Sequence, residues 1–178
     1  PPVTINKVTS NVDENLKKVL KRVVELGDTK KSMTAADLPL IITDVLETSE
    51  TKRIELLNCS ISSGLNLRAT ATIHLKIDTK EYLEAGSGNG GYDAFMSAIK
   101  KILKRIHLKA PELVDYQIRI PRGGKTDALT EAIITWQVNG KRLQTIGIDS
   151  DQVIAAVNST LKMLNLQLMQ KEVAEQQA

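Results

Sequence analysis

Residues 67–77 read Leu-Arg-Ala-Thr-Ala-Thr-Ile-His-Leu-Lys-Ile. Every odd-numbered position is apolar, and every position between them carries a polar or charged side chain. Because successive side chains of a strand point to opposite faces, this alternation predicts a strand with one buried face and one solvated face. Half-buried strands of this kind are typical of antiparallel sheets.

The flanking segments complete a βββα unit. Strands are predicted at residues 54–61 and 80–86, before and after the alternating segment. The glycine-rich residues 86–91 (GSGNGG) then lead into a helix. Helical spacing gives this helix one apolar face, formed by Phe95, Ile99, Ile102, Leu103 and Ile106.

The same pattern occurs a second time. Strands are predicted at residues 113–120, 129–138 and 141–148, with Asn139-Gly140 as the tight turn of a hairpin. An offset of 61 aligns Gly86 with Gly147, and an offset of 62 aligns the apolar faces of the two helices, pairing Phe95 with Val157. We therefore expect an α+β fold built from duplicated βββα units, repeat one at 54–108 and repeat two at 112–168.

The residues before the first repeat predict a small helical subdomain. Residues 1–10 are polar and proline-led and are predicted to be a linker, followed by a helical linker subdomain at 11–50. Its two helices have apolar faces at helical spacing: Leu16, Val19, Leu20, Val23 and Val24, then Leu38, Ile41, Ile42, Val45 and Leu46. The duplicated domain is expected at 51–168, and residues 169–178 are expected to form a polar tail.

The composition argues against several classes of protein. The net charge of +3 is small and dispersed, which does not favour a nucleic-acid partner. The single cysteine, Cys59, excludes an internal disulfide, and no apolar run is long enough for a membrane span or a leader. We therefore expect a cytoplasmic protein without a membrane or nucleic-acid partner.

Catalytic motifs are lacking. The only histidines, His74 and His107, lie far apart in the sequence, and there is no CxxC, Walker or GxSxG motif. Residues 122–127 resemble a phosphate loop in composition but not in spacing, and the basic residues of 100–109 lie opposite the apolar face of their helix. We expect no catalytic residues and no metal site in this chain.

The two junctions between a strand and the following helix differ. Residues 88–91 (GNGG) leave the N-terminus of the first helix without a side-chain cap, so a small anion can bind there. Residues 149–151 (DSD) supply their own caps to the second helix. Asp93 is placed to meet an ammonium group, and Tyr92 and Tyr116 to form an apolar wall, which suits an amino acid. The alternative reading of residues 88–91 is a simple turn.

Three segments together carry a resemblance to a known family. They are residues 88–94 (GNGGYDA), residues 123–129 (GGKTDAL) and the helix from Asp151-Gln152 to Met163-Leu164-Asn165. The chain resembles the C-terminal regulatory domain of the α-isopropylmalate synthase and citramalate synthase family over residues 54–166. Residues 11–46 resemble the linker subdomain that precedes that domain.

The resemblance implies that the chain is a fragment without its own catalysis. Full-length members have a TIM barrel that condenses acetyl-CoA with a 2-oxo acid using a divalent metal; neither cofactor is expected in this part. The regulatory domain of the family forms a homodimer and binds the end-product amino acid near the dimer interface. The expected partners are therefore a second copy, the catalytic barrel of the same polypeptide, and leucine or isoleucine as effector.

The resemblance also implies roles for individual residues. Gly88, Asn89 and Gly90 match the loop that cradles the effector, and Tyr92 and Asp93 match the start of the helix. The positions that match the pocket wall and the facing loop are Leu113, Tyr116, Ile120, Thr130 and Gln152. Gly91-Tyr92 replaces the Pro-Val of the commoner pattern, as in the citramalate synthase branch, so leucine and isoleucine both stay open as the effector. A ligand-free dimerisation module and a nucleic-acid-binding α+β domain are the rival readings.

Overall fold

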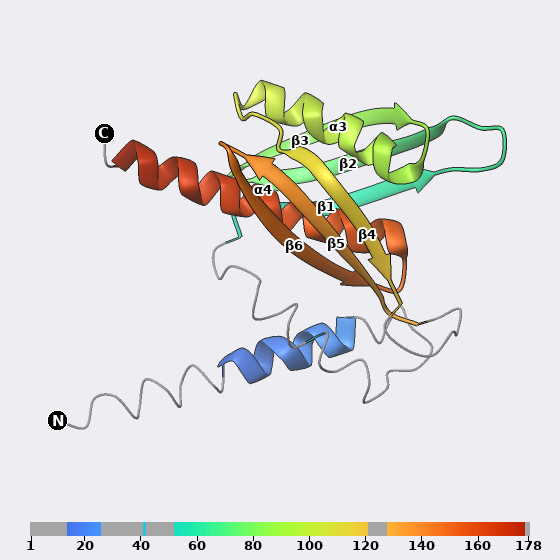
Figure 1. Cartoon of the computed structure of the whole chain (residues 1–178), viewed down its shortest axis with the longest axis horizontal. Helices are drawn as coiled ribbons and strands as arrows, with labels where there is room; N and C mark the ends of the chain where they lie inside the picture. The colour runs from blue at the N-terminus through green and yellow to red at the C-terminus, as the bar shows by residue number, and fades with distance from the viewer. Residues whose placement is uncertain (1–13, 26–40, 42–51, 121–127, 177–178) are drawn as a thin grey trace.

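The computed structural model of the chain describes residues 14–25, 41, 52–120 and 128–176. Residues 14–25 are helical. The elements that follow are, in chain order, β1 (Ile54–Ser62), β2 (Ala69–Ile77), β3 (Lys80–Gly88), α3 (Gly91–Arg105), β4 (Glu112–Arg119), β5 (Thr130–Val138), β6 (Lys141–Asp149) and α4 (Gln152–Gln176) (Figure 1). The predicted α+β fold with two βββα units is confirmed.

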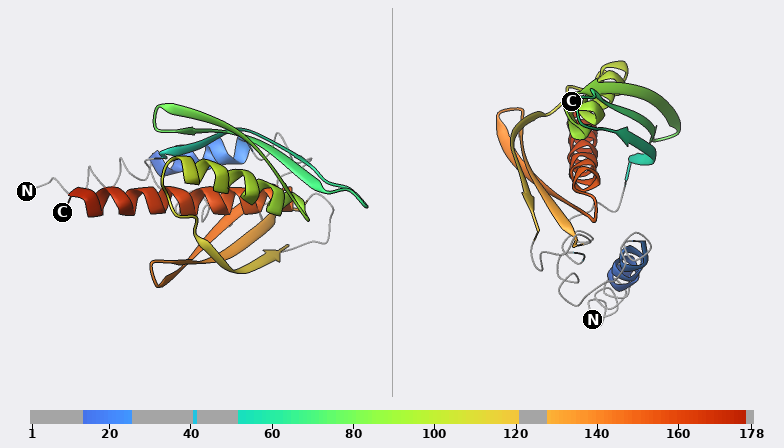
Figure 2. Two further views of the ribbon diagram at one scale, coloured as in Figure 1. Left: turned by 90° about the horizontal axis from the view of Figure 1, so that it is seen from above. Right: turned by 90° about the vertical axis from the view of Figure 1, so that its right-hand side faces the viewer.

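The strands form two separate antiparallel sheets, in the orders β1-β2-β3 and β4-β5-β6. α3 packs on β2 and β3, and α4 packs on β5 and β6. Figure 2 shows both helices between the two sheets, where they contact each other. The inner faces of the sheets and the helices therefore share one apolar core.

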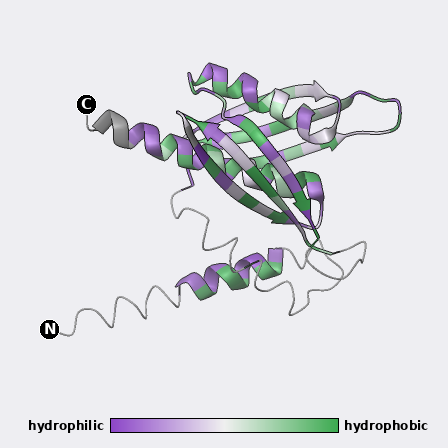
Figure 3. Ribbon diagram, viewed as in Figure 1, coloured by the Kyte–Doolittle hydropathy of each residue, from purple (hydrophilic) through white to green (hydrophobic). Residues whose placement is uncertain are grey.

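β2 has the alternation that the sequence predicts (Figure 3). Its buried side chains, none more than 7% exposed, are Ala69, Ala71, Ile73, Leu75 and Ile77. Leu67, which the sequence placed in the same strand, is 69% exposed. The reason is that the strand begins only at Ala69, where pairing with Gly88 of β3 starts.

The two repeats match with an offset of 61 through their helices. The buried residues of α3 are Ala94, Phe95, Met96, Ala98, Ile99, Ile102 and Leu103. The same offset leads to seven buried residues of α4: Ala155, Ala156, Val157, Ser159, Thr160, Met163 and Leu164. The predicted offset of 62 is therefore wrong. It aligned large apolar residues, whereas Ala156 and Thr160 occupy the positions of Phe95 and Ile99.

A glycine near the end of the third strand brings each helix close to its sheet. A Cβ atom added to Gly86 would lie 2.3 Å from the carbonyl oxygen of Ala94 and 2.5 Å from the nitrogen of Ala98. A Cβ atom added to Gly147 would lie 2.0 Å from the carbonyl oxygen of Ala155 and 2.4 Å from the nitrogen of Ser159. No side chain fits between strand and helix backbone at either place.

The helix at residues 14–25 packs on the outer face of the second sheet. Val19 and Val23 contact a small cluster formed by Ile41, Leu129 and Ile148. Arg22 adds a hydrogen bond, with Nη2 donating to the carbonyl oxygen of Ile148 at 3.0 Å. The second predicted helix of the linker subdomain lies outside the described residues, apart from the buried Ile41.

α4 extends further than the sequence predicted. It continues to Gln176, so most of the polar tail expected from residue 169 is helical. Its Glu172 accepts a 3.2 Å hydrogen bond from Nη1 of Arg53, whose Nε and Nη2 each donate to Asp78 at 2.7 Å. Through this contact, the last turns of α4 pack against the residue that precedes β1.

None of the helices in the described ranges combines the length and the apolar character that a membrane span requires.

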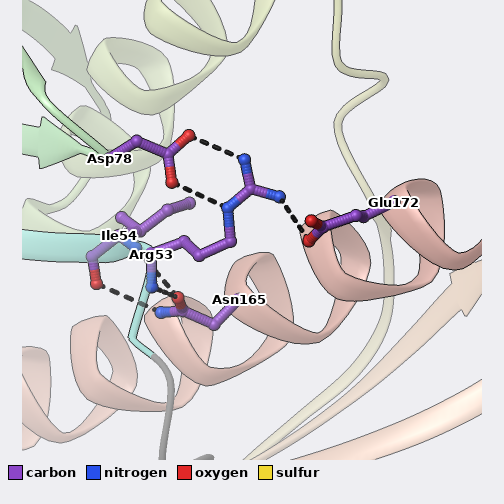
Figure 4. A network of polar contacts seen from close by, with 5 residues as sticks. All are labelled: Arg53, Ile54, Asp78, Asn165 and Glu172. Atoms are coloured by element: carbon purple, nitrogen blue, oxygen red, sulfur yellow. Dashed lines mark hydrogen bonds and ion pairs between the residues drawn. The ribbon is translucent and has the colours of Figure 1, made fainter.

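The buried Asn165 of α4 fixes the start of β1 (Figure 4). Its Oδ1 accepts the backbone N–H groups of Arg53 and Ile54 at 2.8 and 2.9 Å. Its Nδ2 donates to the carbonyl oxygens of Ile54 and Leu161 at 3.1 and 3.0 Å. A helix of the second repeat thus completes the hydrogen bonding of the first strand of the first repeat.

We predict that Gly147→Ala lowers the free energy of unfolding by about 3 kcal/mol or more, because the new methyl group meets helix backbone that cannot rotate away. Gly90→Ala is the matched control. Gly90 has a φ of −145° and nothing within 4 Å of an added Cβ, so we expect a loss of at most about 1 kcal/mol, from the poorer preference of alanine for the N-cap position. Urea denaturation measures both variants, and equal losses in the two would contradict the close-packing account.

Candidate functional site

The N-terminus of α3 has no side-chain cap. β3 runs to Gly88, two residues beyond the predicted strand, and Gly90 is the N-cap residue, with no side-chain hydrogen bond to the first turn. The carboxylate of Asp93, also in that turn, accepts the backbone N–H of Asn89 at 2.9 Å. The first N–H groups of a helix lack intrahelical partners, so this end is a place where an anion is stabilised.

The N-terminus of α4 carries its own acceptors. Oδ1 of Asp151 accepts the backbone N–H groups of Val153 and Ile154 at 2.7 and 3.0 Å. Asp149 in turn accepts the N–H of Asp151 at 3.0 Å. The predicted contrast between an open first junction and a self-capped second junction is therefore confirmed.

The two helix starts lie side by side. A Cβ atom added to Gly91 would be 2.9 Å from Cγ2 of Ile61, at the end of β1, and 3.6 Å from Cγ1 of Val153, in the first turn of α4. Gly88 is equally confined, because its added Cβ would lie 2.5 Å from Oδ2 of Asp93. Gly91 of the uncapped turn thus lies against side chains of both repeats.

Tyr92 and Tyr116 meet at this junction. Their ring centroids are 5.2 Å apart with an interplanar angle of 10°, and Tyr92 also lies nearly parallel to Phe95 at 6.2 Å. The hydroxyl group of Tyr92 reaches Oγ1 of Thr160 in α4 at 2.7 Å. Three elements, α3, β4 and α4, therefore converge on the Tyr92 ring.

Both phenols are held in their neutral form. Burial raises the pKa of Tyr92 well above its ordinary value, although the hydrogen bond between Tyr92 and Thr160 opposes the shift. Burial also raises the pKa of Tyr116, and the negative charge of Asp151 adds to that effect. The wall formed by the two rings is thus uncharged, as an apolar ligand group requires.

The other residues predicted for the site are more spread out. Gln152 is exposed and begins α4, and Thr130 is buried at the start of β5, opposite Asp149. Ile120 is 57% exposed just after β4. Leu113 is 40% exposed near the other end of β4, about 10 Å along the strand from Tyr116. The structure thus brings Tyr92, Asp93 and the glycine turn to one end of the molecule, with Leu113 set apart.

Sequence reasoning missed Thr160 and Val153, which contact or approach the predicted residues. With the offset of 61, Thr160 takes the place of Ile99 and Val153 takes the place of Tyr92. A hydroxyl group on the buried face of a helix was the signal available. It was hidden because the offset of 62 put Leu161 in that place.

The histidine and basic residues that the sequence analysis considered make contacts within the domain itself. His74 pairs with Glu81 at 2.8 Å, and Lys101 of the basic helix face donates to the carbonyl oxygen of Ala85 at 2.6 Å. Burial raises the pKa of Cys59. Among the described residues, no three His, Cys, Asp or Glu side chains gather as metal ligands would. Residues 122–127 lie outside the described part.

The fold and the junction define an internally duplicated βββα domain with one uncapped helix end beside an aromatic wall. The chain belongs to the family described as the LeuA allosteric (dimerisation) domain, whose match covers residues 32–168.

Curated relatives of two kinds align with it. A provisionally named (R)-citramalate synthase of Archaeoglobus fulgidus is 33% identical over 153 residues, which is 86% of this chain and 31% of the relative. A second provisionally named (R)-citramalate synthase, from Methanothermobacter thermautotrophicus, is 34% identical over 92% of this chain and 32% of the relative. A 2-isopropylmalate synthase of Aquifex aeolicus is 31% identical over 89% of this chain and 30% of the relative. The chain therefore spans about a third of the length of these relatives.

We predict that the free energy of unfolding falls as the pH rises above about 10, the ordinary pKa of tyrosine. The native protein keeps the phenol proton of Tyr92 where the unfolded chain releases it, so raising the pH favours unfolding. Tyr92→Phe should make this decline shallower, by at most about 1.4 kcal/mol per pH unit. Urea denaturation between pH 8 and 11 tests this, and an unchanged decline in the variant would contradict it.

Proposed function

We propose that this chain is the effector-binding and dimerisation domain of a synthase of the 2-isopropylmalate or citramalate type. The observation that carries the proposal is the uncapped N-terminus of α3 beside the Tyr92–Tyr116 stack, in a member of the LeuA allosteric family. The effector is a branched-chain amino acid that gives feedback inhibition.

The site suits a zwitterion. The carboxylate of the effector accepts hydrogen bonds from the N–H groups of the first turn of α3, where the helix dipole stabilises negative charge. Its ammonium group pairs with Asp93, whose bond to Asn89 engages only one of its two carboxylate oxygens. The other helix start is unsuitable, because Asp151 already fills that position with negative charge.

The two aromatic rings receive the aliphatic side chain. Leucine is the effector if the parent protein is a 2-isopropylmalate synthase, and isoleucine if it is a citramalate synthase. Relatives of both kinds match at 33% and 31% identity, so similarity alone does not separate them. The isomers have equal volume, and the shape of the pocket discriminates between them by about 1–3 kcal/mol.

A second copy of the chain covers β4. This edge strand and the residue after it expose four large apolar side chains: Leu113, Val114, Tyr116 and Ile120. Tyr116 belongs both to this surface and to the aromatic wall, so the effector lies near the dimer interface. In the parent protein, a catalytic barrel on the same polypeptide, with a divalent metal, condenses acetyl-CoA with a 2-oxo acid, and this domain supplies regulation without catalysis.

We predict that leucine or isoleucine raises the melting temperature of the chain. A ligand that binds only the native state at 100 times its Kd stabilises it by about 2.7 kcal/mol. Side-by-side melts with leucine, isoleucine, valine and alanine rank the ligands, with alanine as the control that lacks a branched side chain. No shift with any of them, in a chain that is still a dimer, would instead identify a ligand-free dimerisation module.

We predict that Asp93→Asn weakens effector binding by about tenfold or more, because it removes the charge that faces the ammonium group. The amide oxygen can still accept the N–H of Asn89, so the loop stays closed. Glu55→Gln, on the exposed side of β1, removes the same charge elsewhere and should bind normally. Titration calorimetry gives the affinities and sedimentation velocity the dimer. Wild-type affinity in Asp93→Asn would remove Asp93 from the ammonium role.

A further inference from the structure

We propose that Thr160 is a positioning residue that sets the selectivity of the effector site: its hydroxyl group fixes the ring of Tyr92, which in turn fixes Tyr116. This inference rests on the proposed function and concerns a residue that contacts Tyr92 from α4. Thr160 is fully buried and does not belong to the glycine turn or to the aromatic stack.

The direction of the hydrogen bond follows from the partners of Thr160. A threonine hydroxyl has a single hydrogen, and Oγ1 of Thr160 donates it to the carbonyl oxygen of Ala156 at 2.8 Å. The phenol of Tyr92 must therefore be the donor in the 2.7 Å contact with Oγ1. The far end of the Tyr92 ring is held by this one acceptor, while its near end is held by the backbone of α3.

Stacking on Tyr92 restrains the exposed ring of Tyr116 as well. Tyr92 is the inner ring, and Tyr116, 37% exposed, is the outer ring that a ligand meets. The rings are nearly parallel at a centroid distance of 5.2 Å, which is a favourable stacking geometry. A displacement of Tyr92 therefore removes the surface on which Tyr116 rests.

Comparison of the repeats shows that Thr160 and Tyr92 are paired departures from the internal symmetry. At the offset of 61, their counterparts are Ile99 and Val153, both apolar. The second repeat places a hydroxyl where the first has an isoleucine, and the first places a phenol where the second has a valine. The phenol of Tyr92 finds its acceptor in Oγ1 of Thr160, while the Thr160 hydroxyl also donates to Ala156, as buried polar groups need hydrogen-bond partners.

Selectivity between leucine and isoleucine demands such a fixed wall. The two side chains differ only in the carbon that carries the branch, so a wall free to shift by one bond length accepts either. A ring restrained at both ends cannot shift in this way.

The test compares Thr160→Val, which keeps the shape but removes the acceptor, with Thr160→Ser, which keeps the hydroxyl group. We expect Thr160→Val to weaken binding of the preferred isomer about tenfold and of the other isomer less than threefold. Thr160→Ser should keep the wild-type ratio of the two Kd values within about twofold. Titration calorimetry with leucine and isoleucine measures the ratios, and thermal melting reports the fold of each variant.

Tyr92→Phe removes the donor of the same hydrogen bond and keeps the ring. It provides the same test if Thr160→Val fails to fold. It should shift the Kd ratio as Thr160→Val does, and the double variant should shift it no further. If the variants weaken both isomers equally, or leave the ratio unchanged, the positioning role is overturned while the proposed function stands. If the wild-type chain binds neither isomer, the proposed function itself fails, and this inference fails with it.

Discussion

The arrangement of this domain depends on one contact made twice: a glycine at the end of the third strand touching the backbone of the following helix. Gly86 and Gly147 leave no room for a side chain, so each helix lies as close to its sheet as backbone atoms allow. The distance between strand and helix is thereby fixed within the first two or so turns of each helix. Both helices then pack between the sheets, and their first turns meet.

The same geometry leads to opposite chemistry at the two helix starts. Asp151 caps α4, whereas Gly90 leaves α3 without a side-chain cap. Because the turns are neighbours, an anion at α3 also lies near the aromatic stack and α4. The two repeats share one arrangement, and the departures from symmetry at Tyr92 and Thr160 make the surroundings of the two helix starts different.

Much of the fold, and the difference between the two helix starts, could be predicted from the sequence. Period-two alternation and glycine placement predicted the strands, the duplication and the open junction, because these depend on local backbone chemistry. The helix offset was wrong because Ala156 and Thr160 do not look like core residues beside Phe95 and Ile99. The Tyr92–Thr160 bond and the Asn165 contact with Ile54 join residues far apart in the chain, and no local pattern encodes them.

We propose that the effector binds at the start of α3 and not at the start of α4. The most direct test is a titration of the isotope-labelled chain with isoleucine and with leucine, followed by backbone amide NMR shifts. We expect large shifts for the N–H groups of Gly91, Tyr92 and Asp93 and small ones for Val153 and Ile154, whose N–H groups already donate to Asp151. Shifts centred on Val153 and Ile154, or none at Gly91, would contradict it.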